Sequence, residues 1–435
     1  MKRWQNKTIS PKGNLMIGEF DTVELINKYS TPLMIMDEKT IRQNCSKLKN
    51  KFNELGINGD ICYASKAFCT KAIYKIVESE GLCVDTVSSG EIYTALSAGF
   101  DSQNIYFHGN NKTISDLNYA VSENIGRIII DNFEEIANLQ TVAKMLNKKQ
   151  KVSLRLCPSV VAKTFSAVVT GAKGSKFGVS CENGDAQKAL KQIDQCENLI
   201  LEGLHVHIGS QIMNSDEYLK TVEVIVDFVN KLKKEGIAIN EVNFGGGFGI
   251  DYIDEQNAEP AEMIVEEMYI LFKELCKKND LALPRFLIEP GRSIVADAGI
   301  TLYTIGSVKY GGDIESVISI DGGMADNPRY ALYQAEYTFD IANKASQEKT
   351  LTASIAGRCC ESGDFIAKHI KIQPCKAGDI LVAYSTGAFN YSMASNYNRL
   401  PKPEILLING DKCSSIVKRE TFEQLAQNES IPSWL

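Results

Sequence analysis

A single lysine ends a short apolar run in the sequence Ile61-Cys62-Tyr63-Ala64-Ser65-Lys66. The run predicts a strand, and because a helix-like stretch follows, we expect Lys66 at the carboxyl end of that strand. Burial disfavours the charged form of a lysine and lowers its pKa, which makes the amine nucleophilic. A neutral amine forms a Schiff base with an aldehyde. A surface lysine at a strand end explains the same pattern when Lys66 is taken alone.

Polar or glycine-rich clusters follow several other apolar runs at the same position relative to the run. In a barrel of parallel strands, reactive groups lie at the carboxyl ends of the strands, so these clusters are expected to converge on one face. This convergence favours a functional interpretation of Lys66. The clusters are Asp85, Asp131-Asn132, His205–Ser210, Gly245–Gly249 and Glu289–Arg292.

Three of these clusters suit a phosphorylated, flat, ring-shaped cofactor. The glycines 245–247 let backbone N–H groups approach an anion, and the hydroxyl of Ser210 can add to the same site. A carboxylate at Glu289 can keep a pyridine nitrogen protonated, and His207 can stack on the ring. An amine, a phosphate site and such a carboxylate together describe pyridoxal phosphate. Taken singly, the glycines also suit a tight turn, Glu289 a salt bridge, and His207 the core.

Eight strand-like runs alternate with helix-like stretches between residues 61 and 288. This alternation is typical of a (β/α)8 TIM barrel, and a doubly wound open sheet is the alternative. Strands buried on both faces read as continuous apolar runs, as Ile128-Ile129-Ile130 does. The runs lie near 61–64, 82–87, 104–107, 127–131, 151–156, 203–208, 241–244 and 285–288.

The texture of the sequence changes after about residue 295. Long helical periodicity stops, and short β-branched runs such as Ser316–Ile320 lie between glycine-rich turns, which predicts a separate β-domain. We therefore expect a PLP-binding (β/α)8 barrel over 32–295 and a C-terminal β-domain, sandwich- or barrel-like, over 296–435. Residues 1–31 are expected to pack with the β-domain, and residues 418–425 to form a short closing helix.

Composition and charge narrow the class of protein. The net charge of -7 over 435 residues argues against a nucleic-acid partner. The twelve cysteines include no Cys-x-x-Cys pair, so we expect no metal site and a reduced, cytoplasmic setting. No apolar run approaches the ~18 residues of a membrane span, so no membrane partner is expected.

Six segments together resemble those of the diaminopimelate decarboxylases, which are alanine-racemase-like (fold type III) enzymes that depend on pyridoxal 5'-phosphate. The resemblance extends from about residue 30 to residue 423. Single motifs are shared with ornithine and arginine decarboxylases, whereas the combination with residues 107–112 and 331–333 is more specific. The segments are Tyr63–Lys66, His205–Gln211, Asn243–Gly249, Glu289–Arg292, Cys360–Asp364 and Ser392–Asn398.

The resemblance implies decarboxylation of meso-2,6-diaminopimelate to L-lysine and CO2, with Lys66, Cys360 and His207 as catalytic residues. Cys360, as proton donor, and Glu361 are expected to reach into the neighbouring subunit, which implies a homodimer with shared active sites. The residues implied to bind the cofactor are Lys66, Asp85, His207, Ser210, Gly245, Gly246, Gly247, Glu289, Pro290, Gly291, Arg292 and Phe389. Those implied to bind the amino-acid substrate are Arg292, Arg329, Tyr333, Glu361 and Phe389.

The chain departs from the family pattern at three positions. Phe389 stands where the family usually has a tyrosine, and a phenyl ring donates no hydrogen bond. Arg358 and Tyr330 replace usual prolines. Two alternatives stay open: a decarboxylase of another basic amino acid of the D-ornithine or D-lysine type, and a non-catalytic homologue that binds pyridoxal phosphate. Arg329 argues against the first, because a guanidinium fork suits a distal carboxylate.

Overall fold

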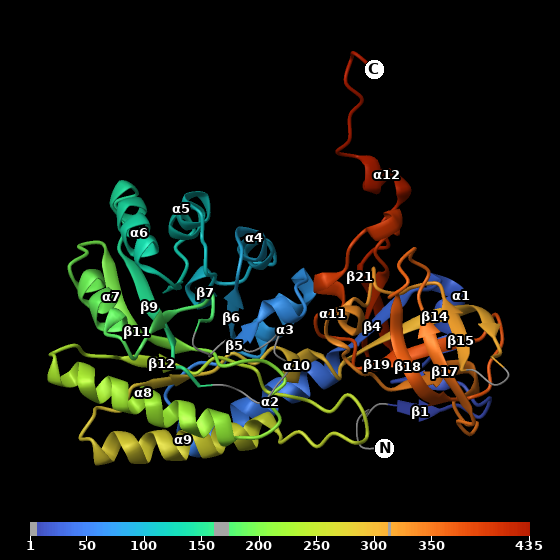
Figure 1. The fold of residues 1–435 in the computed structure, drawn as a ribbon, viewed down its shortest axis with the longest axis horizontal. Helices are drawn as coiled ribbons and strands as arrows, with labels where there is room; N and C mark the ends of the chain where they lie inside the picture. Colours follow the sequence, from blue (N-terminus) through green and yellow to red (C-terminus); the bar gives the residue numbers. More distant parts are fainter. Residues whose placement is uncertain (1–6, 161–173, 312–314) are drawn as a thin grey trace. The chain divides into compact units, whose positions relative to one another are not determined.

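The computed structural model describes residues 7–160, 174–311 and 315–435. The chain forms two compact units (Figure 1). The barrel unit comprises Arg42–Ile250 and Asn257–Ile294, and the β-unit comprises Met1–Ile41, Asp251–Gln256 and Val295–Leu435. Each unit has its own sheet and its own core.

Eight parallel strands build the barrel unit, in the order in which they occur in the chain, and the short β10 (Val179–Ser180) adds to β9. A parallel bridge between Ile61 and Ile288 joins the first strand to the last, and the Cys62 N–H donates to the Ile288 carbonyl at 2.8 Å. The ring is therefore closed: the predicted barrel is confirmed, and the open sheet is wrong. The strands are β5 (Cys62–Ala64), β6 (Cys83–Thr86), β7 (Ile105–Phe107), β8 (Arg127–Ile130), β9 (Gln150–Cys157), β11 (Leu199–Val206), β12 (Glu241–Asn243) and β13 (Arg285–Leu287).

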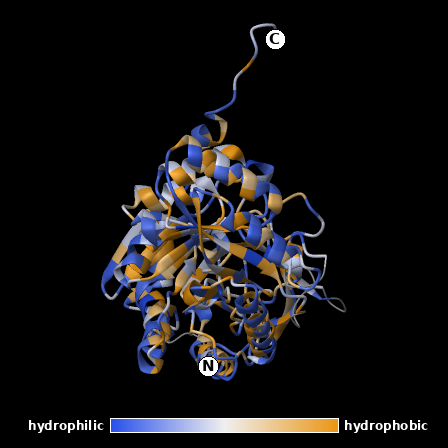
Figure 2. Ribbon diagram, turned by 90° about the vertical axis from the view of Figure 1, so that its left-hand side faces the viewer, coloured by the Kyte–Doolittle hydropathy of each residue, from blue (hydrophilic) through white to orange (hydrophobic). Residues whose placement is uncertain are grey.

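Helices place one apolar side against the strands; most of them follow a barrel strand, and the first, 38–55, precedes all of them. Figure 2 shows that these helices carry both hydrophilic and hydrophobic residues, as expected for a layer between strands and water. Polar side chains fix several helix starts: Thr113 and Asp116 form a reciprocal capping box at the start of α5. The helices are α2 (Glu38–Leu55), α3 (Lys71–Ser79), α4 (Ser89–Ser97), α5 (Ile114–Ser122), α6 (Phe133–Met145), α7 (Asp185–Asp194), α8 (Asp216–Lys234), α9 (Ala261–Lys278) and α10 (Arg292–Val295).

The amino ends of the barrel strands carry a buried ionic cluster centred on Glu241, the first residue of β12. Its Oε1 accepts from Arg127 Nε at 2.7 Å and from Ser153 Oγ at 3.1 Å. Its Oε2 accepts from Arg127 Nη2 at 2.9 Å and from Arg285 Nη1 at 3.1 Å. The cluster ties four strands together at the end of the barrel that in such folds serves stability.

The β-unit contains a mixed sheet in the order β18-β17-β15-β14-β4-β20-β21, with β19 pairing β14 and β16. The strand β4 pairs with β14 and β20, so it lies in this sheet and not in the barrel, which we expected to begin at residue 32. The hydrophobic periodicity of a segment can identify it as a strand, but it does not show with which other strands the segment pairs. The strands are β4 (Leu33–Asp37), β14 (Gly299–Lys309), β15 (Ser316–Ile320), β16 (Phe339–Ile341), β17 (Leu351–Ala356), β18 (Phe365–Ile372), β19 (Ile380–Tyr384), β20 (Glu404–Asn409) and β21 (Lys412–Val417).

The N-terminal part of the β-unit is a three-stranded sheet of β1 (Lys7–Ile9), β2 (Leu15–Ile17) and β3 (Phe20–Asp21), followed by α1 (Thr22–Tyr29). Leu15 and Ile17 of β2 share a buried core with residues of the large sheet. Residues 1–6 of the predicted N-terminal segment lie outside the described residues. The short helices are α11 (Arg329–Tyr333) and α12 (Phe422–Ala426). Among the described residues, no helix is both long and apolar enough to cross a membrane.

Candidate active site

Lys66 lies in the turn that directly follows β5, as its place after an apolar run predicted. Its Nζ is 3.8 Å from Oδ2 of Asp85, which is on the neighbouring strand β6. The side chain of Lys66 is 46% exposed whereas that of Asp85 is 2% exposed. The expectation of a buried lysine is thus wrong: the strand end is buried, but the amine projects beyond it. Burial raises the pKa of Asp85, although His108 and Lys66 oppose the shift.

Glu289 follows β13, the last strand of the barrel, and three side chains contact its carboxylate. Oε1 accepts from Asn243 Nδ2 at 2.7 Å and lies 2.8 Å from His108 Nε2. Oε2 lies 3.0 Å from His205 Nε2, within hydrogen-bond distance. Burial alone would raise the pKa of Glu289, but His108 and His205 outweigh it and hold this pKa well below its usual range. Glu289 is therefore a fixed, ionised carboxylate.

The two histidines at positions 205 and 207 differ in environment although they are two residues apart. His205 is the penultimate residue of β11 and is buried against Glu289, and burial lowers its pKa to about 4. His207 lies just beyond the strand and is partly exposed, with Nδ1 accepting from the Gly246 N–H at 3.3 Å. Burial and the nearby Lys66 hold the pKa of His207 well below 6.5. It is a neutral, flat ring at the carboxyl ends of the strands.

Ser210 and Arg292 come together from the loops after β11 and β13. The Arg292 guanidinium donates from Nη2 to Ser210 Oγ at 3.0 Å. Arg292 is also the first residue of α10. A hydroxyl, a guanidinium and a helix start at one place form a set of groups that binds anions.

The glycine triplet 245–247 packs tightly against neighbouring backbone. A Cβ on Gly246 would lie 1.9 Å from the Glu289 carbonyl oxygen, so only glycine fits there. The N–H groups of Gly245 and Gly246 donate to Asn243 Oδ1 and His207 Nδ1. The triplet thus positions Glu289, Asn243 and His207 relative to one another, a role that the sequence pattern did not reveal.

Four residues that surround this site have no role in the sequence-based prediction. Arg155 of β9 is buried, and Nε lies 3.9 Å from Asp131 Oδ1. Asp85 and Glu289 also interact with its charge. His108, His205 and Asn243 lie in motifs that carry the family resemblance, and His205 also belongs to the polar cluster 205–210 at the end of its apolar run. Arg155 has one weak signal, a charge within the apolar run 151–156.

The β-unit holds the remaining predicted residues. Arg329 is buried, and Nη1 donates to the Tyr337 hydroxyl at 2.6 Å while its guanidinium lies 4.9 Å from the Tyr252 ring centroid. These aromatic contacts restrict the direction of its charge. Tyr333 ends the same helix, α11, and is partly exposed. Arg329 is therefore a fixed, buried cation rather than a residue of a surface turn.

Cys360 and Glu361 are exposed on the β-unit. The Cys360 N–H donates to Asn398 Oδ1 at 2.9 Å, and Glu361 accepts a hydrogen bond from the Tyr397 hydroxyl. Phe389 has a positive φ of 67°. The structure thus presents Cys360 and Glu361 at a surface rather than in the interior, so neither serves as core filling.

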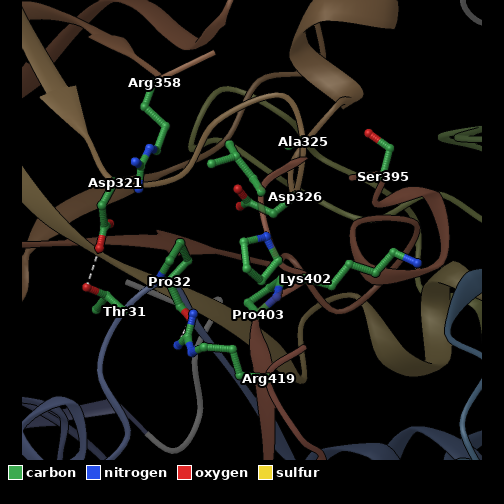
Figure 3. A pocket seen from close by; sticks show the side chains of 12 residues that line it. Thr31, Pro32, Asp321, Ala325, Asp326, Arg358, Ser395, Lys402, Pro403 and Arg419 are labelled. Carbon is green, nitrogen blue, oxygen red and sulfur yellow. Dashed lines mark hydrogen bonds between the residues drawn. The ribbon is translucent and has the colours of Figure 1, made fainter. Parts of the chain in front are cut away.

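A small cavity of about 110 Å³ lies near Arg358, one of the departures from the family pattern. Figure 3 shows Arg358 and Arg419 on opposite sides of it, with Asp321 and Asp326 between them. Both carboxylates are already bonded: Asp321 accepts from Thr31 at 2.6 Å, and Asp326 from Tyr303 at 2.5 Å. Both acidic side chains that line the cavity are therefore already engaged in hydrogen bonds within the protein.

The barrel, its reactive amine and its clamped carboxylate define a class of enzyme, and comparison with known families identifies that class. Residues 38–296 match the model described as "Pyridoxal-dependent decarboxylase, pyridoxal binding domain". The chain belongs to the pyridoxal-dependent decarboxylases.

Relatives place it more narrowly. It is 41% identical to the diaminopimelate decarboxylase of Bacillus subtilis, over 95% of each chain, and 42% identical to that of Bacillus methanolicus, over 95% of this chain and 96% of the relative. A crystal structure of diaminopimelate decarboxylase from M. jannaschii superposes with a TM-score of 0.93 at 31% identity, covering 100% of both chains. Within its class, the chain is a member of the diaminopimelate decarboxylase family.

Proposed function

We propose that this protein uses pyridoxal phosphate to decarboxylate meso-2,6-diaminopimelate to L-lysine and CO2. The observation that carries the proposal is the placement of Lys66 and Glu289. They follow β5 and β13, the two strands whose bridge closes the barrel, so the amine and the ionised carboxylate share one end of it. The relatives support the choice of substrate, since one of the matched structures is a diaminopimelate decarboxylase in complex with L-lysine.

The donor set in the barrel unit fits the cofactor. The exposed amine of Lys66 suits the aldehyde, and the ionised Glu289 suits the ring nitrogen. Ser210 and Arg292 suit the phosphate, as do the backbone N–H groups of Gly291 and Arg292, whereas Pro290 has no N–H to offer. When bound, pyridoxal phosphate supplies an electron sink for the pair left behind by the departing carboxylate.

The chain's own residues prepare this chemistry. Lys66 offers the amine, and Asp85 at 3.8 Å is the group with which it exchanges a proton. Glu289 would hold the proton of the ring nitrogen, and His207 would offer the cofactor a neutral, flat ring that adds no charge. The glycines 245–247 hold the loop that aligns Glu289 and His207.

Most of the substrate-binding groups in this proposal belong to the β-unit. The fixed guanidinium of Arg329 binds the distal carboxylate, and the further substrate-binding residues are Tyr333 and Phe389 of the β-unit and Arg292 of the barrel unit. Cys360 and Glu361, both exposed, complete the site of a second copy of the chain, Cys360 as proton donor and Glu361 at the distal amine. The protein is then a homodimer with shared active sites, in a cytoplasmic setting.

The test is production of L-lysine and CO2 from meso-diaminopimelate by the purified protein loaded with pyridoxal phosphate. L-lysine, D-lysine, L-ornithine and D-ornithine serve as parallel substrates. Lys66→Ala should abolish turnover, while the exposed Lys71→Ala serves as a matched control and should not. Turnover of ornithine or lysine instead of diaminopimelate would refute the substrate and the role of Arg329. Bound cofactor with no turnover of any substrate would favour the non-catalytic alternative.

A further inference from the structure

The three side chains that contact Glu289 come from three different strands or their ends. His108 follows β7, His205 lies on β11, and Asn243 ends β12. Each is at most 4% exposed. The proposed reaction uses Glu289 but gives neither histidine a task, so the two buried rings need an explanation of their own.

The surroundings of His205 fix its protonation. An ionised carboxylate only accepts hydrogen bonds, so the Nε2 atom that faces Glu289 Oε2 at 3.0 Å must carry the proton. Nδ1 of the same ring is buried and has no hydrogen-bond partner among the residues that the structure describes. A doubly protonated ring would leave an N–H unpaired there, which is costlier than an unpaired acceptor. His205 is thus a neutral donor to Glu289.

His108 lies between two carboxylates at unequal distances. Its Nε2 is 2.8 Å from Glu289 Oε1 but 3.9 Å from Asp85 Oδ1. Asn243 donates to Glu289, and His108 Nε2 approaches it at 2.8 Å although the angle of that contact lies outside hydrogen-bond geometry, whereas Asp85 Oδ1 accepts no hydrogen bond from the described residues. Two carboxyl groups in one site with such different surroundings take different protonation states. The geometry favours charge on Glu289 and a proton on Asp85.

We infer that His108 and His205 are positioning residues that hold Glu289 ionised and aimed into the site, leaving Asp85 as the carboxyl group that exchanges protons with Lys66. This inference rests on the proposed function and deepens it. Asp85 then acts as the acid–base group of the site, while Glu289 stays ionised throughout.

Several charged groups face Glu289, and a test must separate them. Apart from His108 and His205, the charged groups are Asp85 of β6 and Arg155 of β9, and Lys66 faces Asp85 from the turn after β5. The titratable side chains of His207 and Cys62 also interact with Glu289. Each histidine is therefore changed singly, with the others left in place. In glutamine, the side-chain N–H group reaches the position of Nε2, whereas leucine has no donor.

The experiment compares His108→Leu, His205→Leu, His108→Gln and His205→Gln with the wild-type protein. His369→Leu is the matched control, because His369 is exposed on the β-unit and pairs with Glu315. Each protein is loaded with pyridoxal phosphate labelled with 15N in the ring. The readouts are the 15N shift of the ring nitrogen and the absorbance of the bound cofactor across pH, with kcat and KM for meso-diaminopimelate.

The leucine variants should bind cofactor but show a ring nitrogen that loses its proton at lower pH than in the wild type. Their kcat should fall about 10- to 100-fold, the usual cost of removing a partner that orients a site ligand, with little change in KM. The glutamine variants should recover most of both signals, and His369→Leu should match the wild type.

Unchanged 15N shifts and kcat in the leucine variants would overturn the inference, as would glutamine variants as impaired as leucine ones, because packing rather than donation would then matter. Should a leucine variant not fold, His→Asn replaces it: its amide is too short to reach Glu289, and equal behaviour of Asn and Gln would refute the role. A wild-type protein that binds no cofactor, or binds it without turnover of any substrate, would instead overturn the proposed function.

Discussion

Substitution of Glu241 tests whether one end of the barrel serves stability and the other end serves catalysis. It lies at the amino end of β12, while Asn243, two residues on, donates to Glu289. We predict that Glu241→Ala lowers stability strongly and leaves kcat unchanged at temperatures where the variant is folded. Barrels of this kind place catalysis at the carboxyl ends of the strands and stability at the other end.

The loss of stability can be estimated from the interactions that Arg285 and Arg127 retain when the Glu241 carboxylate is removed. Arg285 retains its ion pair with Asp60 at 2.5 Å and is 35% exposed, so it loses little. Arg127 is 6% exposed at its side chain and keeps, among the described residues, a 3.3 Å bond to the Gly126 carbonyl, Glu202 at 4.0 Å and the Tyr106 ring, whose centroid is 5.6 Å from the guanidinium carbon. Removing one partner of a buried ion pair costs about 3–5 kcal/mol. Glu241→Gln keeps part of the bonding and should cost about half of that.

Thermal unfolding is the assay. In a unit of about 250 residues, each kcal/mol shifts Tm by about 2–4 °C, so Glu241→Ala should lower Tm by roughly 6–20 °C. Glu235→Ala is the control, because its ion pair with Lys191 is exposed and worth at most about 1 kcal/mol. A shift no larger than that of the control, or a loss of kcat in folded Glu241→Ala, would show that this reasoning is wrong.

Three further predictions concern the β-unit. Arg329→Lys keeps the charge but loses the fork and the hydrogen bond to Tyr337, so KM for meso-diaminopimelate should rise about 10- to 100-fold; steady-state kinetics test this, and an unchanged KM contradicts it. Phe389→Tyr adds a hydroxyl and should tighten pyridoxal phosphate binding up to about 10-fold, the value of one hydrogen bond; a fluorescence titration measures Kd, and equal or weaker binding counts against it. Burial raises the pKa of Asp326 to about 7 despite bonds from Tyr303 and the Gly323 N–H. The folded chain thus binds a proton that the unfolded chain releases above pH ~4, and wild-type stability falls as pH rises from about 4 to 7. Asp326→Asn should therefore raise Tm relative to wild type more at pH 8 than at pH 4, and an equal difference at both pH values would refute the cause.

The eight barrel strands could be located from sequence because strands buried on both faces read as continuous apolar runs. In β8, for example, all four residues are buried. The membership of β4 could not be predicted, because its apolar residues 33–36 suit any buried strand and its partners, β14 and β20, lie far along the chain. Pairing over such distances depends on the whole fold and leaves no local pattern.

The candidate site was predictable in its residue types but not in its contacts. Lys66, Glu289 and Asp85 follow from the rule that strand ends carry chemistry. The exposure of Lys66 depends on the turn geometry after β5, which the sequence does not specify. His108 follows β7 and Glu289 follows β13, and these two strands are not neighbours in the barrel. The sequence around one residue therefore does not predict its contact with the other.

The bridge between Ile61 and Ile288 has a consequence for how the chain acquires its shape. It joins the first and last strands of the ring, so it closes the longest loop in the barrel and must await the six strands between them. Lys66 and Glu289 follow these two strands and therefore come together only when the ring is complete. A ligand that binds both groups favours the complete ring by mass action. We expect the yield of native protein in a producing cell to depend on its supply of pyridoxal phosphate, since unclosed chains expose strand edges to aggregation and proteolysis.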